Sequence, residues 1–235
     1  MIVHRQPGGK DVHEQEEPAD APTGEPIVRL ADEFFLLALD DRSGRSMLSP
    51  RVLGLGLAGG LLAELVLDRK ITVHEDQIIV GDRQPPADPL SQRVLGYLVN
   101  ELTAYDVRTW LVYLAQEARE QVAGRLRRAG RVRQEQVRRL WRTEVVYPPT
   151  DLNAAALPRA RLVHALNRRL PMQWPEVTLA GLTVATGLDS HLLYTADDAA
   201  KEYLRHLITH LPSSVHALVW HVHAAVGDAV ITGRT

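Results

Sequence analysis

The sequence predicts a mainly α-helical protein, a bundle of helices around one buried, glycine-rich apolar helix, with small β-hairpins. Three observations predict this class: apolar residues recur at helical spacing through most of the chain after Ala31, residues 50–67 form an apolar, glycine-rich stretch, and short strand-like runs lie between the helical segments. The chain has 235 residues, 45% of them hydrophobic, so it is long enough to bury one sizeable core. We therefore expect one main domain.

Residues 1–26 are polar, acidic and rich in proline and glycine. Such a segment buries too little apolar surface to offset the entropy lost on ordering, so we expect a disordered acidic tail. Met1–Lys10 also lacks the apolar stretch that a signal peptide carries after its basic start. We therefore expect a cytoplasmic protein whose folded domain covers residues 27–235.

The apolar stretch at 50–67 is predicted to be the central helix of the core. Its most apolar part, Val52–Leu67, is shorter than the ~20 apolar residues that a membrane span needs, and it carries the charged residue Glu64. Its glycines are expected to let other helices approach closely. A buried helix is therefore favoured over a transmembrane one.

The elements after this helix follow from local patterns. Two β-branched runs flank the polar turn His74–Gln77, which predicts a hairpin over residues 71–80. A proline-rich loop at 85–89 leads into helices predicted over 90–103 and 107–129. Gly130 supplies the left-handed stop of the second helix.

Arginine is concentrated in one segment, although the chain as a whole has a net charge of −2. Only Glu120 and Glu135 oppose the positive charges between residues 119 and 142. Each basic residue held near an anionic bilayer contributes roughly 1 kcal/mol to binding, so this segment is a candidate lipid-binding patch. The alternative is an ordinary solvated helix face. The candidate headgroup ligands are Arg119, Arg125, Arg127 and Arg128.

A second hairpin is predicted over Arg139–Pro149, directly after the basic segment. Its apolar residues include a tryptophan and a tyrosine, ring types that suit a membrane interface. The same residues also suit a contact between subunits, so both interpretations remain. The residues concerned are Leu140, Trp141, Val145, Val146 and Tyr147.

Catalytic and metal chemistry find little support in the sequence. The chain has no cysteine, which excludes a disulfide framework, a thiolate nucleophile and a cysteine-ligated zinc site. The densest histidine cluster, His216 with His221 and His223, lacks the spacing of two ligands on one helix face. We therefore expect no metal site, no cofactor and no enzyme activity.

Nucleic-acid binding is a weaker alternative. Residues 65–71 and 126–132 each have the pattern of a helix that runs into a turn and a strand, as in winged-helix domains. That pattern occurs wherever a helix packs on a hairpin, and the net negative charge opposes an extended phosphate contact. In the obvious polar cluster, Arg133–Gln136, Glu135 would face phosphate repulsion. We expect no nucleic-acid partner.

The segment Leu30–Val73 carries an ordered series of signals. An acidic start and an apolar run lead to the turn Asp40–Gly44, then to the glycine-rich helix and the basic step Arg69–Lys70. This series resembles the opening of the Golgi phosphoprotein 3 family, and the resemblance continues, through residues 126–132, over nearly all of Leu30–Val230. The chain looks like a bacterial, actinobacterial-type member.

The resemblance implies a fold and a role. The fold is a helical bundle around a buried hydrophobic helix, here Pro50–Leu67, with a projecting hairpin, here Arg139–Pro149. Eukaryotic members of the family are peripheral membrane adaptors that bind the headgroup of phosphatidylinositol 4-phosphate. The resemblance therefore implies a peripheral membrane module.

The family's headgroup site is mostly not kept. Its tryptophan falls on Ser49, the arginine of its glycine-rich helix on Ala58, and its two further arginines on Gln116 and Arg119. Only Arg119 keeps its residue type. Two lost charge-assisted contacts, at ~1.5 to 3 kcal/mol each, remove orders of magnitude in affinity, so we do not expect tight binding of that lipid.

These observations together predict a non-catalytic peripheral membrane module that resembles phosphatidylinositol 4-phosphate-binding adaptors. The expected partner is an anionic lipid or a phosphoinositide. The alternative is a protein-interaction adaptor that binds a protein partner and no lipid. The hairpin is also a candidate contact for a homo-oligomer, and the expected localisation is cytoplasmic with association to a membrane.

Overall fold

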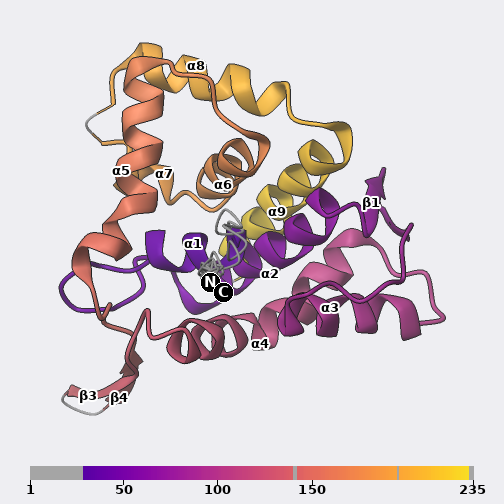
Figure 1. Ribbon diagram of the computed structural model, residues 1–235, viewed down its shortest axis with the longest axis horizontal. Helices are drawn as coiled ribbons and strands as arrows, with labels where there is room; N and C mark the ends of the chain where they lie inside the picture. Colours follow the sequence, from indigo (N-terminus) through magenta and orange to yellow (C-terminus); the bar gives the residue numbers. More distant parts are fainter. Residues whose placement is uncertain (1–28, 140–141, 195, 233–235) are drawn as a thin grey trace, which may run out of the picture.

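The computed structural model describes residues 29–139, 142–194 and 196–232, and this part of the chain is mainly helical (Figure 1). The predicted fold class is confirmed. The predicted disordered tail, residues 1–26, lies outside the described residues. The helices are α1 (Leu30–Leu37), α2 (Pro50–Leu67), α3 (Pro89–Asn100), α4 (Val107–Arg128), α5 (Leu152–Arg168), α6 (Trp174–Ala185), α7 (Asp189–Leu192), α8 (Asp198–Thr209) and α9 (Ser213–Thr232). The strands are β1 (Ile71–His74), β2 (Gln77–Val80), β3 (Glu135–Arg139) and β4 (Arg142–Val146).

Helix α2 is the centre of the bundle. Figure 1 shows α3 and α4 on one side of it and α6 and α9 on the other, and α1 also packs against it. Every residue from Val52 to Val66 is buried. By length and composition α2 is apolar enough to cross a membrane, but most of it lies inside the protein. The predicted central helix is therefore confirmed, with the bounds expected from the sequence.

Glycines in α2 permit the close approach of its neighbours. A Cβ atom at Gly54 would lie 2.6 Å from the carbonyl oxygen of Ala115 in α4. At Gly56 it would lie 2.3 Å from the ring of Phe34 in α1. Real Cβ atoms do not tolerate such distances, so glycine here is a packing requirement of the core.

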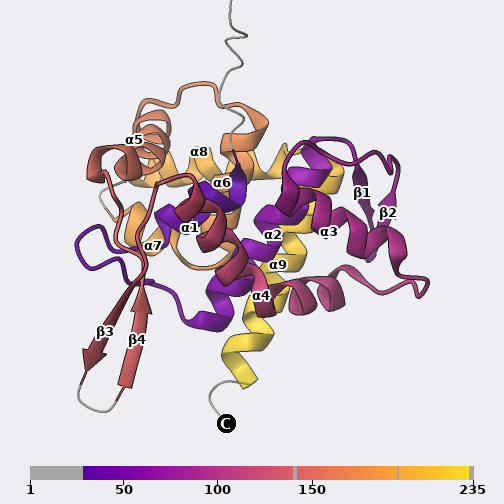
Figure 2. The same cartoon turned by 60° about the horizontal axis from the view of Figure 1, so that its bottom comes forward.

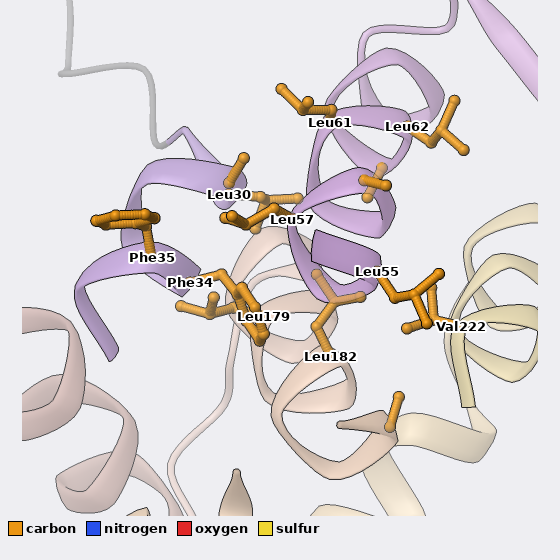
Figure 3. Packing of buried hydrophobic residues seen from close by; sticks show 14 of the residues in the cluster. Leu30, Phe34, Phe35, Leu55, Leu57, Leu61, Leu62, Leu179, Leu182 and Val222 are labelled. Atoms are coloured by element: carbon orange, nitrogen blue, oxygen red, sulfur yellow. The ribbon is translucent and has the colours of Figure 1, made fainter. Parts of the chain in front are cut away.

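The apolar core forms where four helices meet. Figure 3 shows Phe34 of α1, Leu57 of α2, Leu179 and Leu182 of α6, and Val222 of α9 gathered around this point. All five side chains are fully buried. Apolar burial of this kind is the main favourable term in folding and holds the two sides of the bundle together.

The two hairpins differ in how well the sequence predicts them. Strands β1 and β2 pair antiparallel over residues 71–80, as predicted, with His74 opposite Gln77. The second hairpin begins earlier than the predicted Arg139, because β3 starts at Glu135, which pairs with Val146. Glu135, Gln136 and Arg138 of β3 are exposed, so no apolar alternation marks this strand in the sequence. Figure 2 shows β3 and β4 projecting from the body of the protein.

Helix α4 ends close to the predicted position. It runs from Val107 to Arg128, and Gly130 follows with a φ of +67°, which is the expected left-handed stop. The chain then turns directly into the second hairpin. The end of α4 and the base of the hairpin are therefore adjacent.

The close packing at Gly56 generates a test of the core. We expect Gly56→Ala to lower the free energy of unfolding by ~1 to 3 kcal/mol, because the added methyl group overlaps the Phe34 ring. Gly96→Ala in α3 is the matched control, since nothing lies within 4 Å of a Cβ atom there. It should raise stability by ~0.5 to 1 kcal/mol through helix propensity. Urea denaturation measures both, and a Gly56→Ala variant as stable as the parent would contradict this packing.

Candidate functional site

Arg125, one of the predicted headgroup ligands, lies inside the protein. Its guanidinium donates to Asp32 through Nε at 2.8 Å, to Asp88 through Nη1 at 2.7 Å and to Glu64 through Nη2 at 3.3 Å. The three carboxylates come from α1, from the N-cap of α3 and from α2. Arg125 is only 7% exposed, so its donors face these carboxylates and not the solvent. It is therefore separate from the surface arginines.

Further hydrogen bonds complete this buried ion cluster, which we define as Arg125, Asp32, Glu64 and Asp88. The Glu64 carboxylate also accepts from the Ala31 backbone N–H at 2.9 Å and from the Ser91 hydroxyl at 3.2 Å. The Ser91 N–H donates to Asp88, whose carboxylate pairs with Arg29 at 2.7 Å. The cluster thereby connects α1, α2, α3 and α4.

Burial and charge act in opposite directions on the carboxyl groups of the cluster. Desolvation raises the pKa of Asp32 and of Glu64, although the neighbouring Arg125 charge lowers both. Desolvation also opposes ionisation of Asp88, but the Ser91 N–H and the Arg125 and Arg29 charges lower its pKa. Burial opposes the charge on Arg125, but the charges of Glu64, Asp32 and Asp88 outweigh it and raise the pKa of Arg125, which stays charged. Arg125 is therefore the counter-ion that makes burial of these carboxyl groups tolerable.

A second group of arginines forms a surface that we call the hairpin face, made by Arg119, Arg127 and Arg128 of α4 together with Gln134, Val145 and Tyr147. A depression of about 420 Å³ lies between α4 and the hairpin and is lined by all of these residues except Arg128. Glu120 also lines it and supplies the opposing charge. The structure therefore brings Arg119 and Arg127 together across one concave surface.

Arg119 is held in place by the hairpin. Its Nη2 donates to the Val145 carbonyl oxygen at 2.9 Å, and its guanidinium carbon lies 5.5 Å from the centre of the Tyr147 ring. Its Nε is buried and has no hydrogen-bond partner among the described residues. A guanidinium over an aromatic face gains cation–π stabilisation, so the geometry fixes this charge at the bottom of the hairpin face.

The other arginines of the face are more exposed. Arg127 donates to the Gln134 side-chain oxygen. Arg128 donates to the Gly124 carbonyl oxygen at 3.2 Å, within its own helix. Beside the hairpin face, Arg131 is exposed beyond the end of α4, and Arg133 is exposed with the Glu135 carboxylate at 3.6 Å from its Nε. Gln134 lines the depression, whereas the sequence singled it out only within the polar cluster Arg133–Gln136; its place here depends on the connection between α4 and β3.

The predicted hairpin residues fall into different places. Leu140 and Trp141 lie outside the described residues. Val145 is half-buried, whereas Val146 and Tyr147 are buried. The Tyr147 ring packs edge-on against Phe35 of α1, with ring centres 5.5 Å apart. Val146 and Tyr147 therefore attach the hairpin to the body of the protein.

Ser49, Ala58 and Gln116 are the positions at which the resemblance predicts that the family's headgroup ligands are not kept. The Ser49 hydroxyl accepts from the Val52 N–H at 3.4 Å and caps α2. Ala58 is fully buried in the core, and Gln116 is exposed on α4. Ser49 and Ala58 therefore contribute no positive charge to the hairpin face.

The structure also shows where the histidine cluster and the polar cluster considered for nucleic-acid binding lie. His221 is buried with its Nε2 at 2.9 Å from the Glu75 carbonyl oxygen, whereas His223 is exposed. Within the described ranges, no group of three histidine, aspartate or glutamate side chains is arranged to hold a metal ion. The polar cluster Arg133–Gln136 lies in the connection between α4 and β3 and at the start of β3, so it does not form a recognition helix.

The fold and the site define a class of protein: a helical bundle around a buried apolar helix, with a projecting hairpin and a cationic surface beside it. A family model described as Golgi phosphoprotein 3 (GPP34) matches residues 30–229. The chain therefore belongs to the Golgi phosphoprotein 3 family, as the resemblance at Leu30–Val73 implies. A search of curated proteins found no match. The bacterial origin stays a prediction.

The buried ion cluster generates a stability prediction. We expect Arg125→Met to lower the free energy of unfolding by about 3 to 5 kcal/mol, because it leaves buried carboxylates without their counter-ion. Arg128→Met should stay within about 0.5 kcal/mol of the parent, because Arg128 is exposed and donates to the Gly124 carbonyl oxygen of its own helix. Urea denaturation of both variants tests the difference.

The same variant has a pH dependence with a defined sign. Loss of the Arg125 charge raises the folded-state pKa values of Asp32 and Glu64 further above their ordinary values. A carboxyl group with a raised folded pKa costs stability once it ionises, as the pH rises through that pKa. The stability deficit of Arg125→Met should therefore be smaller at about pH 5 than at about pH 8. A deficit that is the same at both pH values would argue against the cluster as its cause.

Proposed function

We propose that this protein is a non-catalytic peripheral membrane module that binds anionic lipid through the hairpin face. The observation that carries the proposal is the depression in which Arg119 and Arg127 converge from α4 opposite the hairpin. Both are donors that suit phosphate oxygens, and guanidinium groups bind phosphate with defined geometry. Membership of the Golgi phosphoprotein 3 family supports a module of this type. A cytoplasmic location with membrane association belongs to the same proposal.

The charge balance on this face supports lipid attraction. Arg127, Arg128 and Arg131 are exposed at the end of α4, and Glu120 is the acidic residue that lines the depression. On the hairpin, Glu144 lies 3.5 Å from Arg45 and is partly neutralised. Three or four arginines near an anionic surface supply roughly 3 to 4 kcal/mol, enough for reversible binding that salt weakens.

Little preference for one phosphoinositide is expected. Ser49 and Ala58 stand where the family's headgroup ligands include a tryptophan and an arginine, and Ala58 is fully buried. Arg119 alone keeps its residue type among those positions. The binding energy should therefore follow surface charge more than headgroup identity.

A protein-interaction role is the second candidate, and an exposed apolar groove favours it. Trp220 of α9 is 57% exposed and lines a groove of about 230 Å³ with Val219, Ile208 and Ala185. Exposed apolar surfaces of this kind occur at protein contacts. An absence of lipid binding would shift the function to this alternative.

The first test is charge reversal on the hairpin face. We expect Arg127→Glu with Arg128→Glu to reduce co-sedimentation with vesicles of phosphatidylcholine and phosphatidylserine by about tenfold or more at low salt. Vesicles that contain phosphatidylinositol or phosphatidylinositol 4-phosphate at the same surface charge should behave similarly. Parent binding should fall at physiological salt.

The matched control carries the same change in net charge elsewhere. Arg83 and Arg168 are exposed and lie off the hairpin face, in the loop after β2 and at the end of α5. Arg83→Glu with Arg168→Glu should lose only the small contribution of net charge. If both double variants lose binding equally, the hairpin face is not the contact.

The second test concerns Trp141, which lies outside the described residues, in the sequence between β3 and β4. If it inserts at the membrane interface, Trp141→Ala should weaken vesicle binding about three- to tenfold while leaving the thermal transition unchanged. Trp220→Ala on α9 is the control. A change in mass by light scattering would assign Trp141 to a subunit contact instead.

A further inference from the structure

A further cavity lies at the opposite end of α4 from the hairpin face. It has a volume of about 490 Å³ and is formed by the last turn of α3, the loop that follows it and the first two turns of α4. Four of its lining residues are aromatic: Tyr97, Tyr105, Trp110 and Tyr113. The volume is within the range of small-molecule sites.

The four rings enclose the cavity with alternating orientations. Tyr97 and Tyr113 have ring centres 5.8 Å apart at 84°, Tyr113 and Trp110 5.8 Å apart at 84°, and Trp110 and Tyr105 6.2 Å apart at 83°. Successive rings are therefore nearly perpendicular, and we call the site formed by these four rings the aromatic box. Trp110 is buried, whereas Tyr105 and Tyr113 are about half exposed. The buried Trp110 ring therefore forms the inner wall of the aromatic box, and the exposed rings of Tyr105 and Tyr113 form its rim.

The charges around the box favour a cation. Glu101 is the charged residue that lines it, and no lining residue is basic. Asn100 and Glu101 stand at the carboxyl end of α3, where the helix dipole adds partial negative charge. At the start of α4 the Thr109 N–H is already paired with the Asp106 carboxylate at 2.7 Å. The amino end of α4 therefore offers little attraction for an anion.

We propose that this aromatic box binds an organic cation whose charge is spread over methyl groups, such as a trimethylammonium group. Aromatic faces attract cations through their quadrupoles, and a weakly hydrated quaternary ammonium loses little on leaving water. The ring walls contact the methyl groups, and the Glu101 carboxylate balances the charge. A primary ammonium, which is strongly hydrated, binds less well in such a box.

The trimethylammonium group could come from either of two ligands, and experiment can distinguish them. A free small molecule such as choline carries it, and so does the headgroup of phosphatidylcholine. Leu102, in the loop beside Glu101, is 99% exposed and would enter the bilayer if the headgroup were the ligand. The experiment therefore has one arm for each source.

The first arm titrates the full-length protein with choline chloride and follows the indole N–H signal of Trp110 by nuclear magnetic resonance, assigned with Trp110→Phe. We expect a saturable shift. The carbon isostere of choline, in which a tert-butyl group replaces trimethylammonium, should bind at least about tenfold more weakly because it lacks the charge. Equal binding of the isostere would overturn the proposal in favour of an apolar pocket.

Variants at the exposed rim test the rings without risk to the core. Tyr105→Leu and Tyr113→Leu should each weaken choline binding about 3- to 30-fold, whereas Tyr113→Phe keeps the ring and should bind like the parent. Glu101→Gln should also weaken binding. Tyr194→Leu, at an exposed tyrosine outside the box, is the control. Unchanged binding in the Tyr105→Leu Tyr113→Leu double variant would overturn the proposal.

The second arm uses vesicles of phosphatidylcholine alone, which have no net charge and so do not engage the hairpin face. Binding that is lost in Leu102→Asp and in the ring variants identifies the lipid headgroup as the source. A shift with choline but no vesicle binding identifies a free small molecule. If the protein shows neither the shift with choline nor binding to these vesicles, the proposal is overturned. The Arg127→Glu Arg128→Glu variant keeps its box intact and should respond as the parent does.

Discussion

The structure depends on the requirement that a buried charge be paired. Arg125 enters the interior and meets carboxylates from α1, α2 and the start of α3, so four helices are held by one guanidinium group. Misplacing any of these helices would leave a charge unpaired in a medium of low dielectric constant, which costs several kcal/mol. The cluster therefore fixes how α4 is rotated against the core. Two residues further along the helix, Arg127 is directed outward as a consequence.

Packing sets a second constraint on the same helices. Gly54 brings α2 into contact with the backbone of α4, and Gly56 brings it into contact with Phe34 of α1. The ion pairs of Arg125 set how α4 is rotated about its own axis, whereas the glycine contacts set how closely α2 approaches α4 and α1. Together they define the frame on which the hairpin stands, because Tyr147 at its base packs on Phe35.

Sequence patterns predicted the helices of the bundle better than they predicted which residues form the candidate sites. The bounds of α2 followed from its apolar run between Pro50 and the polar residues after Leu67, all of which are local signals. Arg125 could not be told apart from Arg127 and Arg128, because its partners lie 93, 61 and 37 positions away in the chain. The aromatic box was missed for a different reason: its rings lie close together in the chain, but they come from two helices and the loop between them, so no single helical periodicity groups them.

Helix α4 carries a candidate site at each end, with Thr109 and Trp110 lining one and Arg127 the other. At a rise of ~1.5 Å per residue these ends are roughly 25 Å apart on a single rigid rod. No flexible linker separates them, so their spacing is set by the helix and not by a distribution of chain lengths. A surface that engages both ends would be held bivalently, at one fixed angle to the protein, and would gain avidity from two individually weak contacts.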